Sequence, residues 1–336
     1  MKWLPSVTAA LLAVLALIGL FFLVSAVADP HLLFGIVVPY AAIGLFLVGI
    51  PYRVLKWARS PVPFHVPTVC GQQKSLAWIP ADDLDSPYRT SGVIKRMALE
   101  ILCFRSLFHN EKFKLNTLKK LQFDSGRLLW FGAIAFHWAL LIILLRHLRF
   151  FTEPVPGFVN ALKSLDGLFQ WTWWPGIFIT DAVLLAAVTY IFLRRVVLPH
   201  LRYISLFTDF FPLWLILGIA ATGLGMRLIW KVPLLPVKEL AIGLITLDPP
   251  APPAFIGRIF YLHLFLVSVL IAYLPYSKLM HSLGVWLSPT RNLKNNSRMV
   301  RHANPWNPAV KVHTYEEYEA EFRARMKKAG LPVDKE

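Results

Sequence analysis

Six apolar segments, each long enough to cross a bilayer as a helix, constrain this chain more than any other feature of its sequence. Backbone polar groups find no water inside a membrane, so an isolated apolar span has to be helical. The sequence therefore predicts an all-α integral membrane bundle of six transmembrane helices. The expected spans are 6–27, 33–55, 127–150, 174–197, 207–230 and 255–284.

These spans divide the chain into four parts. They are two N-terminal transmembrane helices in 1–56, a basic cytoplasmic loop in 57–126, a four-helix membrane domain in 127–286 and a cytoplasmic tail in 287–336. The first span also resembles a cleavable signal peptide, because a basic Lys2 precedes an apolar stretch that ends in small residues. Its apolar core is longer than the roughly 7–15 residues of such peptides, which favours a retained span.

The formal net charge of +16 is distributed unevenly along the chain. Segment 53–127 carries 13 Lys and Arg against 6 Asp and Glu, and the tail 288–336 carries 10 against 6. By the positive-inside rule, this distribution predicts a multi-pass protein of the cytoplasmic (inner) membrane with both termini in the cytoplasm. Topology thus accounts for the basic excess, and no nucleic-acid-binding motif accompanies it.

Four histidines lie inside two of the expected spans, His137 and His147 in one and His263 and His281 in the other. An ionisable side chain in hydrocarbon is costly, so its presence there points to a function. If the two helices are antiparallel, His147 lies at the depth of His263, and His137 at the depth of His281. Each pair can then ligate one haem iron from both faces. The haems would be b-type, because the chain has no Cys-x-x-Cys-His motif.

The spacing of these histidines supports the pairing, but the two helices have unequal spacings. The 18 residues from His263 to His281 make about five full helical turns, so both side chains face the same way over roughly 27 Å. The 10 residues from His137 to His147 cover only about 15 Å and fall about 80° short of three turns. Pro275, between His263 and His281, is a candidate for a kink that reconciles the two spacings.

Two other classes of protein remain open on these residues. Intramembrane histidines also form proton relays in transporters and channels, or hydrogen bonds between the helices of a pure membrane anchor. A visible spectrum separates the first class from a cytochrome, because a purified haem protein is red and a transporter is colourless.

The remaining metal-binding residue types give no second site. The two cysteines, Cys70 and Cys103, fall in the basic loop with no zinc or iron–sulfur spacing, so any iron–sulfur cluster must belong to a partner. The acidic start and basic end of 315–328 predict a short helix in the tail. Six other histidines are expected at the surface: His31, His65, His109, His200, His302 and His313.

Two related families are similar to the chain at these residues. The histidine spacings of 10 and 18 residues resemble the cytochrome b, or gamma, subunit of respiratory nitrate reductase, which holds two bis-histidine haems b and oxidises quinol. From about residue 50 onward, the chain resembles the DsrM family of membrane cytochromes in the dissimilatory sulfite-reductase-associated complex. The stretches that match are SPVPF at 60–64, CGQQKSL at 70–76, FRSLFHN at 104–110, LRHLRFFTEP at 145–154 and SPTRNLKNNSR at 288–298.

The resemblance implies partners that composition cannot reveal. They are a cytoplasmic iron–sulfur subunit related to heterodisulfide reductase, a multihaem cytochrome c, a ferredoxin-like protein and a second quinone-interacting membrane subunit. Carried over by position, His147 and His263 would ligate the haem far from the cytoplasm, and His137 and His281 the nearer one. Relative to the nitrate reductase type, this chain has an additional span and a larger cytoplasmic loop.

The expected function is electron transfer between quinol and that iron–sulfur subunit, in an oxidoreductase complex of sulfur metabolism. Quinol would be oxidised beside the outer haem, and the 53–127 loop and 288–336 tail would dock the soluble partner. Five charged residues are expected near the outer face, as contacts of the quinone or of haem propionates: Arg146, Arg149, Lys163, Asp181 and Arg258.

Overall fold

The computed structural model describes most of the chain. The described residues are 3–60, 71–109, 111–115, 121–167, 177–250, 256–288, 290–297 and 312–334. Parts of the expected basic loop and tail, and with them Cys70, His65 and His302, lie outside this set.

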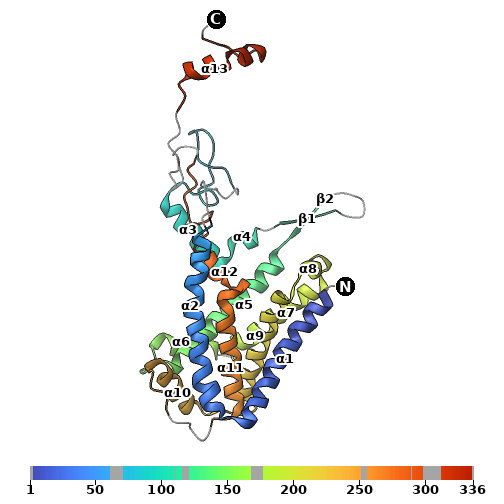
Figure 1. Cartoon of the computed structure of the whole chain (residues 1–336), viewed down its shortest axis with the longest axis vertical. Coiled ribbons are helices and arrows are strands. Elements are labelled where there is room, and N and C mark those ends of the chain that lie inside the picture. The colour runs from blue at the N-terminus through green and yellow to red at the C-terminus, as the bar shows by residue number, and fades with distance from the viewer. Residues whose placement is uncertain are drawn as a thin grey trace.

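Long apolar helices form one bundle (Figure 1). The helices are α1 (Trp3–Val27), α2 (Val38–Ala58), α5 (Arg127–His147), α7 (Ile179–Val197), α9 (Phe207–Leu228) and α11 (Arg258–Tyr273). A seven-residue π-helix, η1 (His31–Val37), leads into α2, and a 3₁₀ turn, η2 (Leu148–Phe150), follows α5.

Five helical segments of the described chain are long and apolar enough to cross a membrane. They are 4–27, 31–58, 127–150, 207–228 and 258–276, close to five of the six predicted spans. The sixth predicted span corresponds to α7, which begins at Ile179 rather than at residue 174. Three charged residues lie in α7: Asp181, Arg194 and Arg195. The crossing of the membrane by α7 therefore remains a prediction.

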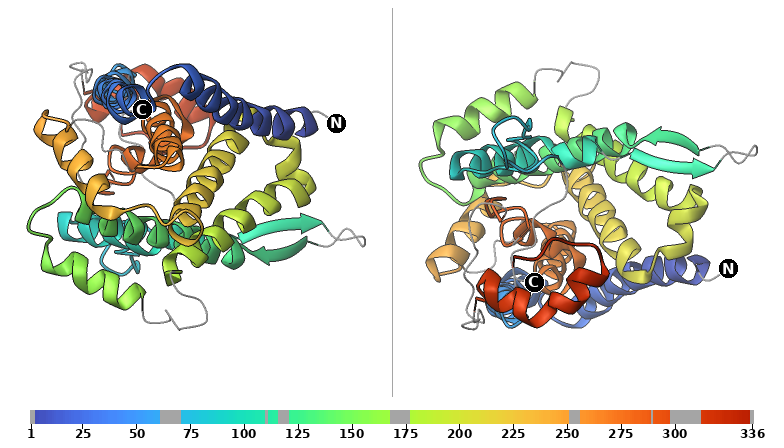
Figure 2. Two further views of the ribbon diagram at one scale, coloured as in Figure 1. Left: turned by 90° about the horizontal axis from the view of Figure 1, so that it is seen from below. Right: turned by 90° about the horizontal axis from the view of Figure 1, so that it is seen from above.

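Two hydrophobic cores meet at α9. The larger core joins α1, α2, α9 and α11 around the fully buried Phe21, Phe210 and Leu266. The smaller core joins α7 and α9 through Val188 and Ile216, with the partly buried Phe136 of α5 against it. Figure 2 shows the bundle end-on, with α1, α2 and α11 on one side and α5 with α7 on the other. Consequently α5 and α11, which carry the predicted ligands, pack against other helices more closely than against each other.

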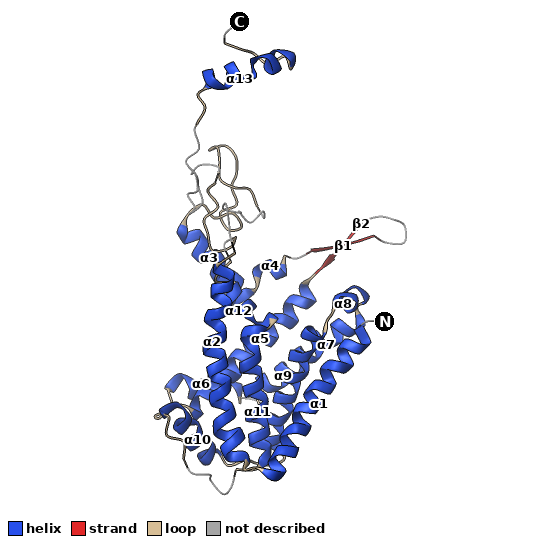
Figure 3. Ribbon diagram, in the orientation of Figure 1, coloured by secondary structure: helices blue, strands red, loops and turns tan. Residues whose placement is uncertain are grey.

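One end of the bundle carries the elements of the basic segments, and we call it the basic end. These elements are α3 (Thr90–Cys103), α4 (Arg105–Phe108), β1 (Glu111–Leu115), β2 (Leu121–Ser125), α8 (Pro199–Ile204), α12 (His281–Gly284) and α13 (Tyr315–Lys328). The two strands form an antiparallel hairpin that pairs Glu111 with Ser125 (Figure 3). The helical bundle confirms the all-α fold class, and this hairpin is a local departure from it, because the alternating polar and apolar residues of EKFKL and LQFDS are a strand pattern.

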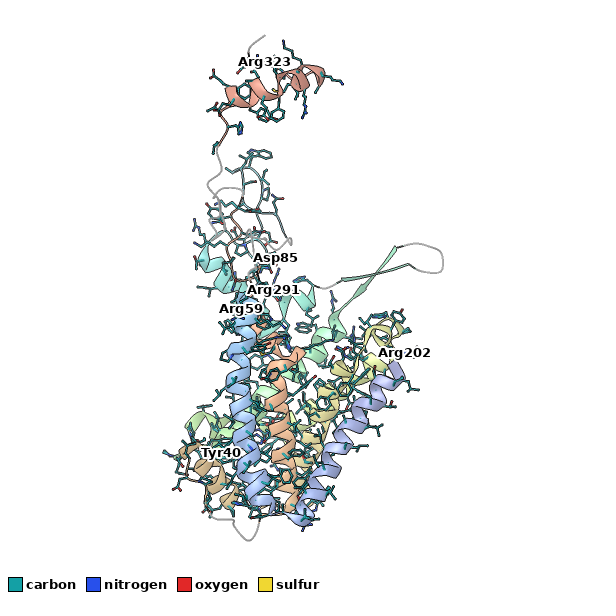
Figure 4. The ribbon with its side chains drawn as sticks, viewed as in Figure 1. Tyr40, Arg59, Asp85, Arg202, Arg291 and Arg323 are labelled. Atoms are coloured by element: carbon teal, nitrogen blue, oxygen red, sulfur yellow. The ribbon has the colours of Figure 1, made fainter. Side chains whose placement is uncertain are left out.

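The opposite end carries two short helices, α6 (Gly157–Asp166) and α10 (Leu234–Thr246), and we call it the α6–α10 end. Tyr40 of α2 donates a hydrogen bond to the Leu244 carbonyl at 3.0 Å, which fixes α10 to the bundle (Figure 4). The N-terminus and α13 both lie toward the basic end (Figure 1). That this end faces the cytoplasm remains a prediction.

Candidate functional site

The structure brings His137 of α5 and His281 of α12 together at the basic end. Their ring centroids are 5.9 Å apart and their planes are nearly perpendicular, at 87°. A pair of imidazoles this close could hold one haem iron between them. The Phe104 ring lies edge-on to His137 at 5.0 Å. This pair is the one predicted to lie nearest the cytoplasm.

The second pair lies toward the α6–α10 end. His147 is the last residue of α5 and His263 lies in the second turn of α11, so both are carried by the ends of long helices on this side. Gly223 of α9 faces His263, and a Cβ at that position would lie 3.3 Å from the imidazole Cε1. A glycine at this point therefore lets α9 approach the ring closely.

All four imidazoles have a hydrogen-bond partner at Nδ1. The carbonyl oxygens of Ala133, Ile143 and Lys278 lie 2.7, 2.7 and 3.0 Å from Nδ1 of His137, His147 and His281, respectively. Because a carbonyl oxygen can only accept, each Nδ1 carries the proton.

His263 reaches the same state through a hydroxyl. Its Nδ1 lies 2.9 Å from Thr222 Oγ1, whose single hydrogen is within reach of the Gly218 carbonyl at 2.9 Å and the Ile219 carbonyl at 3.0 Å. With that hydrogen directed at either carbonyl, Oγ1 accepts from the ring. In each of the four rings, Nε2 is thus the basic nitrogen that can bind a metal, with Nδ1–H fixing the ring orientation.

This donor set fits two haems. Within the described chain no group of three or more His, Cys, Asp or Glu side chains gathers as a metal site. A haem would require only two ligands from the protein. His137 with His281, and His147 with His263, would be the residues to supply them through Nε2.

The predicted continuous stripe from His263 to His281 was wrong. Helix α11 ends at Tyr273, and two 3₁₀ turns, η3 (Leu274–Tyr276) and η4 (Lys278–Met280), separate it from α12. The break falls at Pro275, as expected for a residue that removes a helical hydrogen bond, and Ser277 is fully extended. His281 is therefore placed by a separate short helix, so the spacings of 10 and 18 residues need not match.

Two of the five predicted outer contacts, Arg146 and Asp181, belong to a buried ion network at the α6–α10 end. Arg146 Nε lies 2.9 Å from Asp166 Oδ2, and its terminal nitrogen lies 2.8 Å from Asp181 Oδ1. Asp166 also accepts hydrogen bonds from the Thr180 backbone N–H at 2.8 Å and hydroxyl at 2.6 Å. The network ties α6 and α7 to the end of α5, one residue from His147.

An aromatic ring completes this network. The guanidinium carbons of Arg146 and Arg227 lie 3.8 and 3.7 Å from the centroid of the buried Phe178 ring. Arg227 also lies 3.8 Å from Asp181. Sequence reasoning missed Asp166, Phe178 and Arg227, because they come from three distant segments and form no local motif.

The other three predicted outer contacts lie apart from the network's ion pairs. Arg149 is half-buried and stacks on Phe150, with 4.7 Å between its guanidinium carbon and the ring centroid. Lys163 is exposed on α6. Arg258 is exposed at the start of α11 and lines a cavity of about 330 Å³ with Phe22 and Trp230.

Three of the four described histidines outside the two pairs confirm the surface prediction. His109, His200 and His313 are exposed, as expected. His31 is only 4% exposed, so its surface assignment was wrong. It lies at the start of the π-helical turn η1, edge-on to the Tyr261 ring at 6.0 Å. A π-helix changes which residues face the core, and hydrophobic periodicity does not reveal it.

The long apolar helices are those of a multi-pass membrane protein, and histidines of two segments lie toward opposite ends of its bundle. The chain belongs to the nitrate reductase gamma subunit family, whose model matches residues 97–303. It is 42% identical over 283 residues to the Hdr-like menaquinol oxidoreductase cytochrome b-like subunit of Archaeoglobus fulgidus, covering 82% of this chain and 84% of that protein. The protein of the same name from Archaeoglobus profundus is 41% identical over 277 residues, with coverage of 80% and 81%.

Proposed function

We propose that this protein is a dihaem cytochrome b of the DsrM type, which exchanges electrons with the quinone pool. It would act as the quinone-interacting electron-transfer subunit of an oxidoreductase complex in sulfur metabolism. The observation that carries the proposal is that the four histidines share one tautomer, with the proton on Nδ1. All present Nε2 as the basic nitrogen; His137 and His281 lie against each other at the basic end, and His147 and His263 both lie toward the α6–α10 end.

The residues that would hold the haems are His137 with His281, and His147 with His263. Two low-spin haems would supply one-electron carriers between the faces of the membrane. The protein's part is to orient each ring through its Nδ1–H bond and to exclude water with apolar helices. In this proposal six helices cross the membrane, including α7, and the basic end faces the cytoplasm.

Quinol oxidation is proposed at the α6–α10 end. Two relatives are named menaquinol oxidoreductase subunits, and a 330 Å³ cavity at this end combines aromatic residues with Arg258. Ligand sites are commonly apolar cavities of about this size with a few polar groups. Arg149, Lys163 and Arg258 are the candidate contacts for quinol or propionates. Arg146 and Asp181 are engaged in ion pairs and would hold the end of α5 in place.

The electron acceptor is proposed to be an iron–sulfur, heterodisulfide-reductase-like subunit at the basic end. Cys103 is exposed and unpaired there, and no cysteine cluster occurs in the sequence, so the cluster must come from a partner. A multihaem cytochrome c, a ferredoxin-like protein and a second quinone-interacting membrane subunit complete the proposed complex.

The haem assignment is tested by four single variants, each replacing one paired histidine with alanine. His147→Ala and His263→Ala should remove the same haem, and His137→Ala and His281→Ala the other, leaving about half of the pyridine haemochrome signal in each case. The exposed His200→Ala is the matched control and should retain both haems. A colourless purified protein, or losses that do not group by pair, would contradict the assignment and favour a histidine proton relay.

The face of quinol oxidation is tested in proteoliposomes. A quinol analogue should reduce the haem that depends on His147 before the one that depends on His137, and Arg258→Ala should slow this reduction. Lys328→Ala, at the far basic end, is the control. If the haem that depends on His137 is reduced first, and is still reduced first in the His147→Ala protein, quinol is not oxidised at the α6–α10 end and the proposal is contradicted.

The docking proposal is tested by deleting residues 289–336. Both haems should remain, because the four paired histidines precede the deletion. Co-purification of the iron–sulfur subunit should fall, because the tail is one of the two large non-membrane segments proposed to dock it. A tail whose charges serve only topology and anionic lipid would give undiminished co-purification, even when the 60–120 loop is also shortened.

A further inference from the structure

The short turn η4 links the orientation of the His281 ring to another helix of the bundle. Lys278 is the first residue of η4, and its carbonyl oxygen lies 3.0 Å from His281 Nδ1. The ammonium group of the same lysine donates a hydrogen bond to Asp209 Oδ1 at 2.8 Å. One residue therefore connects the imidazole to a carboxylate on α9.

Asp209 is held firmly in the first turn of α9. Its side chain is only 7% exposed. Its second oxygen, Oδ2, accepts a hydrogen bond from the Leu206 backbone N–H at 3.0 Å, which caps the start of the helix. Helix α9 also contributes to both hydrophobic cores. Asp209 is therefore a fixed point at the basic end, to which a mobile segment can be attached.

The segment that carries His281 has little helical support of its own. Turn η4 has three residues and α12 has four, and helices this short gain little stability from their own hydrogen bonds. The Ser277 hydroxyl acts within the segment, because it donates to the Leu274 carbonyl and accepts from the Leu279 N–H. The Lys278–Asp209 hydrogen bond instead reaches another helix, so it can fix where the turn lies.

We propose that Asp209 is a positioning residue for His281, acting through Lys278 without touching the imidazole. With its ammonium group held by Asp209, Lys278 keeps its carbonyl in line with Nδ1–H, and this bond sets the plane of the ring. The angle between the His281 and His137 rings, 87° here, depends on that plane. The inference rests on the proposed function, in which His281 is a haem ligand, but the stability of the turn can be measured without haem.

Arg195 separates this role from a general need for positive charge beside Asp209. Its guanidinium lies 3.6 Å from Asp209 Oδ1, so it also places a cation there. Arg195 belongs to the end of α7, however, and donates its hydrogen bond to the Ser205 hydroxyl at 3.2 Å. Removing either cation takes one positive charge from Asp209, whereas removing Lys278 also releases η4.

The test compares single variants of the full chain in nanodiscs by electron paramagnetic resonance. The g values of a low-spin ferric haem with two imidazole ligands depend on the angle between the rings. Asp209→Asn and Lys278→Met should therefore shift the largest g value of the haem at the basic end and leave that of the other haem unchanged. Lys278→Arg should keep the wild-type signal, because it can still donate to Asp209. Arg195→Met is the matched control and should also keep it.

The second measurement needs no haem. Hydrogen–deuterium exchange of peptides covering 278–285 in the haem-free protein should be about three- to tenfold faster in Lys278→Met, as expected for loss of one partly exposed, charge-assisted hydrogen bond. Arg195→Met should leave this exchange unchanged, and unchanged exchange in α11 shows that the bundle remains folded. Because the Lys278 side chain is 62% exposed, Lys278→Met tests the inference even if Asp209→Asn does not fold.

The outcomes separate this inference from the broader proposal. Equal shifts of the g value in Lys278→Met and Arg195→Met would mean that charge alone is sensed, and would overturn the positioning role. Faster exchange at 278–285 with an unchanged g value would also overturn it, because the turn would then move without turning the ring. Faster exchange in a protein that binds no haem under any condition would support the link through Lys278 while counting against the proposed dihaem function.

Discussion

Replacing Asp166 with alanine should weaken the α6–α10 end, because three polar groups converge on this buried carboxylate. Asp166 receives two hydrogen bonds from Thr180, at 2.8 and 2.6 Å, and pairs with Arg146 at 2.9 Å. Its side chain is 3% exposed and that of Arg146 is 8% exposed, so water cannot replace what is lost. Breaking a buried ion pair from one side typically costs about 3–5 kcal/mol.

The loss of stability in Asp166→Ala depends on the interactions that Arg146 retains. It still has Asp181 at 2.8 Å and the Phe178 ring, so its charge is not left alone, and we expect about 3 kcal/mol rather than the upper value. Removing both partners, as in Arg146→Met with Asp166→Leu, should cost less than the sum of the single changes. Contacting residues in such a network typically couple by about 0.5–3 kcal/mol.

The assay is reversible unfolding in mixed detergent micelles, followed by circular dichroism. Glu153→Ala is the matched control, because Glu153 pairs with Lys238 but its side chain is 68% exposed. An exposed pair contributes only about 0–1 kcal/mol. If Asp166→Ala destabilises the protein no more than Glu153→Ala, the network does not hold this end together.

Two further predictions concern single contacts. Thr222→Val should remove the acceptor for His263 Nδ1–H and weaken binding of the corresponding haem about 10–100-fold in a haem-titration assay. Thr222→Ser should restore it, and equal affinity in all three proteins would contradict the role of the hydroxyl. Gly49→Ala should lower thermal stability by about 1–3 kcal/mol, because the new Cβ would lie 2.7 Å from the Pro275 side chain. Gly44→Ala, with open space around it, should leave stability unchanged or raise it slightly.

Features that depend on local sequence were predicted well. The tail helix begins and ends at Tyr315 and Lys328, as predicted, because its charges and the Thr314 capping box are local signals. Five of the six expected spans follow from length and hydropathy alone. The proximity of His137 to His281 was predicted from chain direction, which sets the depth of each residue, although α5 and α11 do not pack directly and His281 lies on α12.

Features that depend on distant segments could not be predicted in the same way. Asp166 reads as an ordinary surface acid in a loop, and only the folded chain shows it against Arg146 and Thr180. The burial of His31 depends on a π-helical turn that shifts the facing of residues.

The break between α11 and α12 gives the two histidine pairs unequal mechanical stiffness. His147 and His263 belong to helices of 21 and 16 residues that pack firmly in the bundle. His281 instead begins a four-residue helix, joined to α11 by two 3₁₀ turns and continuous with the chain that leads to the tail. A displacement of the tail is therefore transmitted along the chain to His281 before it reaches the other three rings. Because coupling between sites is reciprocal, a ligand that fixes His281 also restrains the tail, while His147 and His263 are less strongly coupled to either.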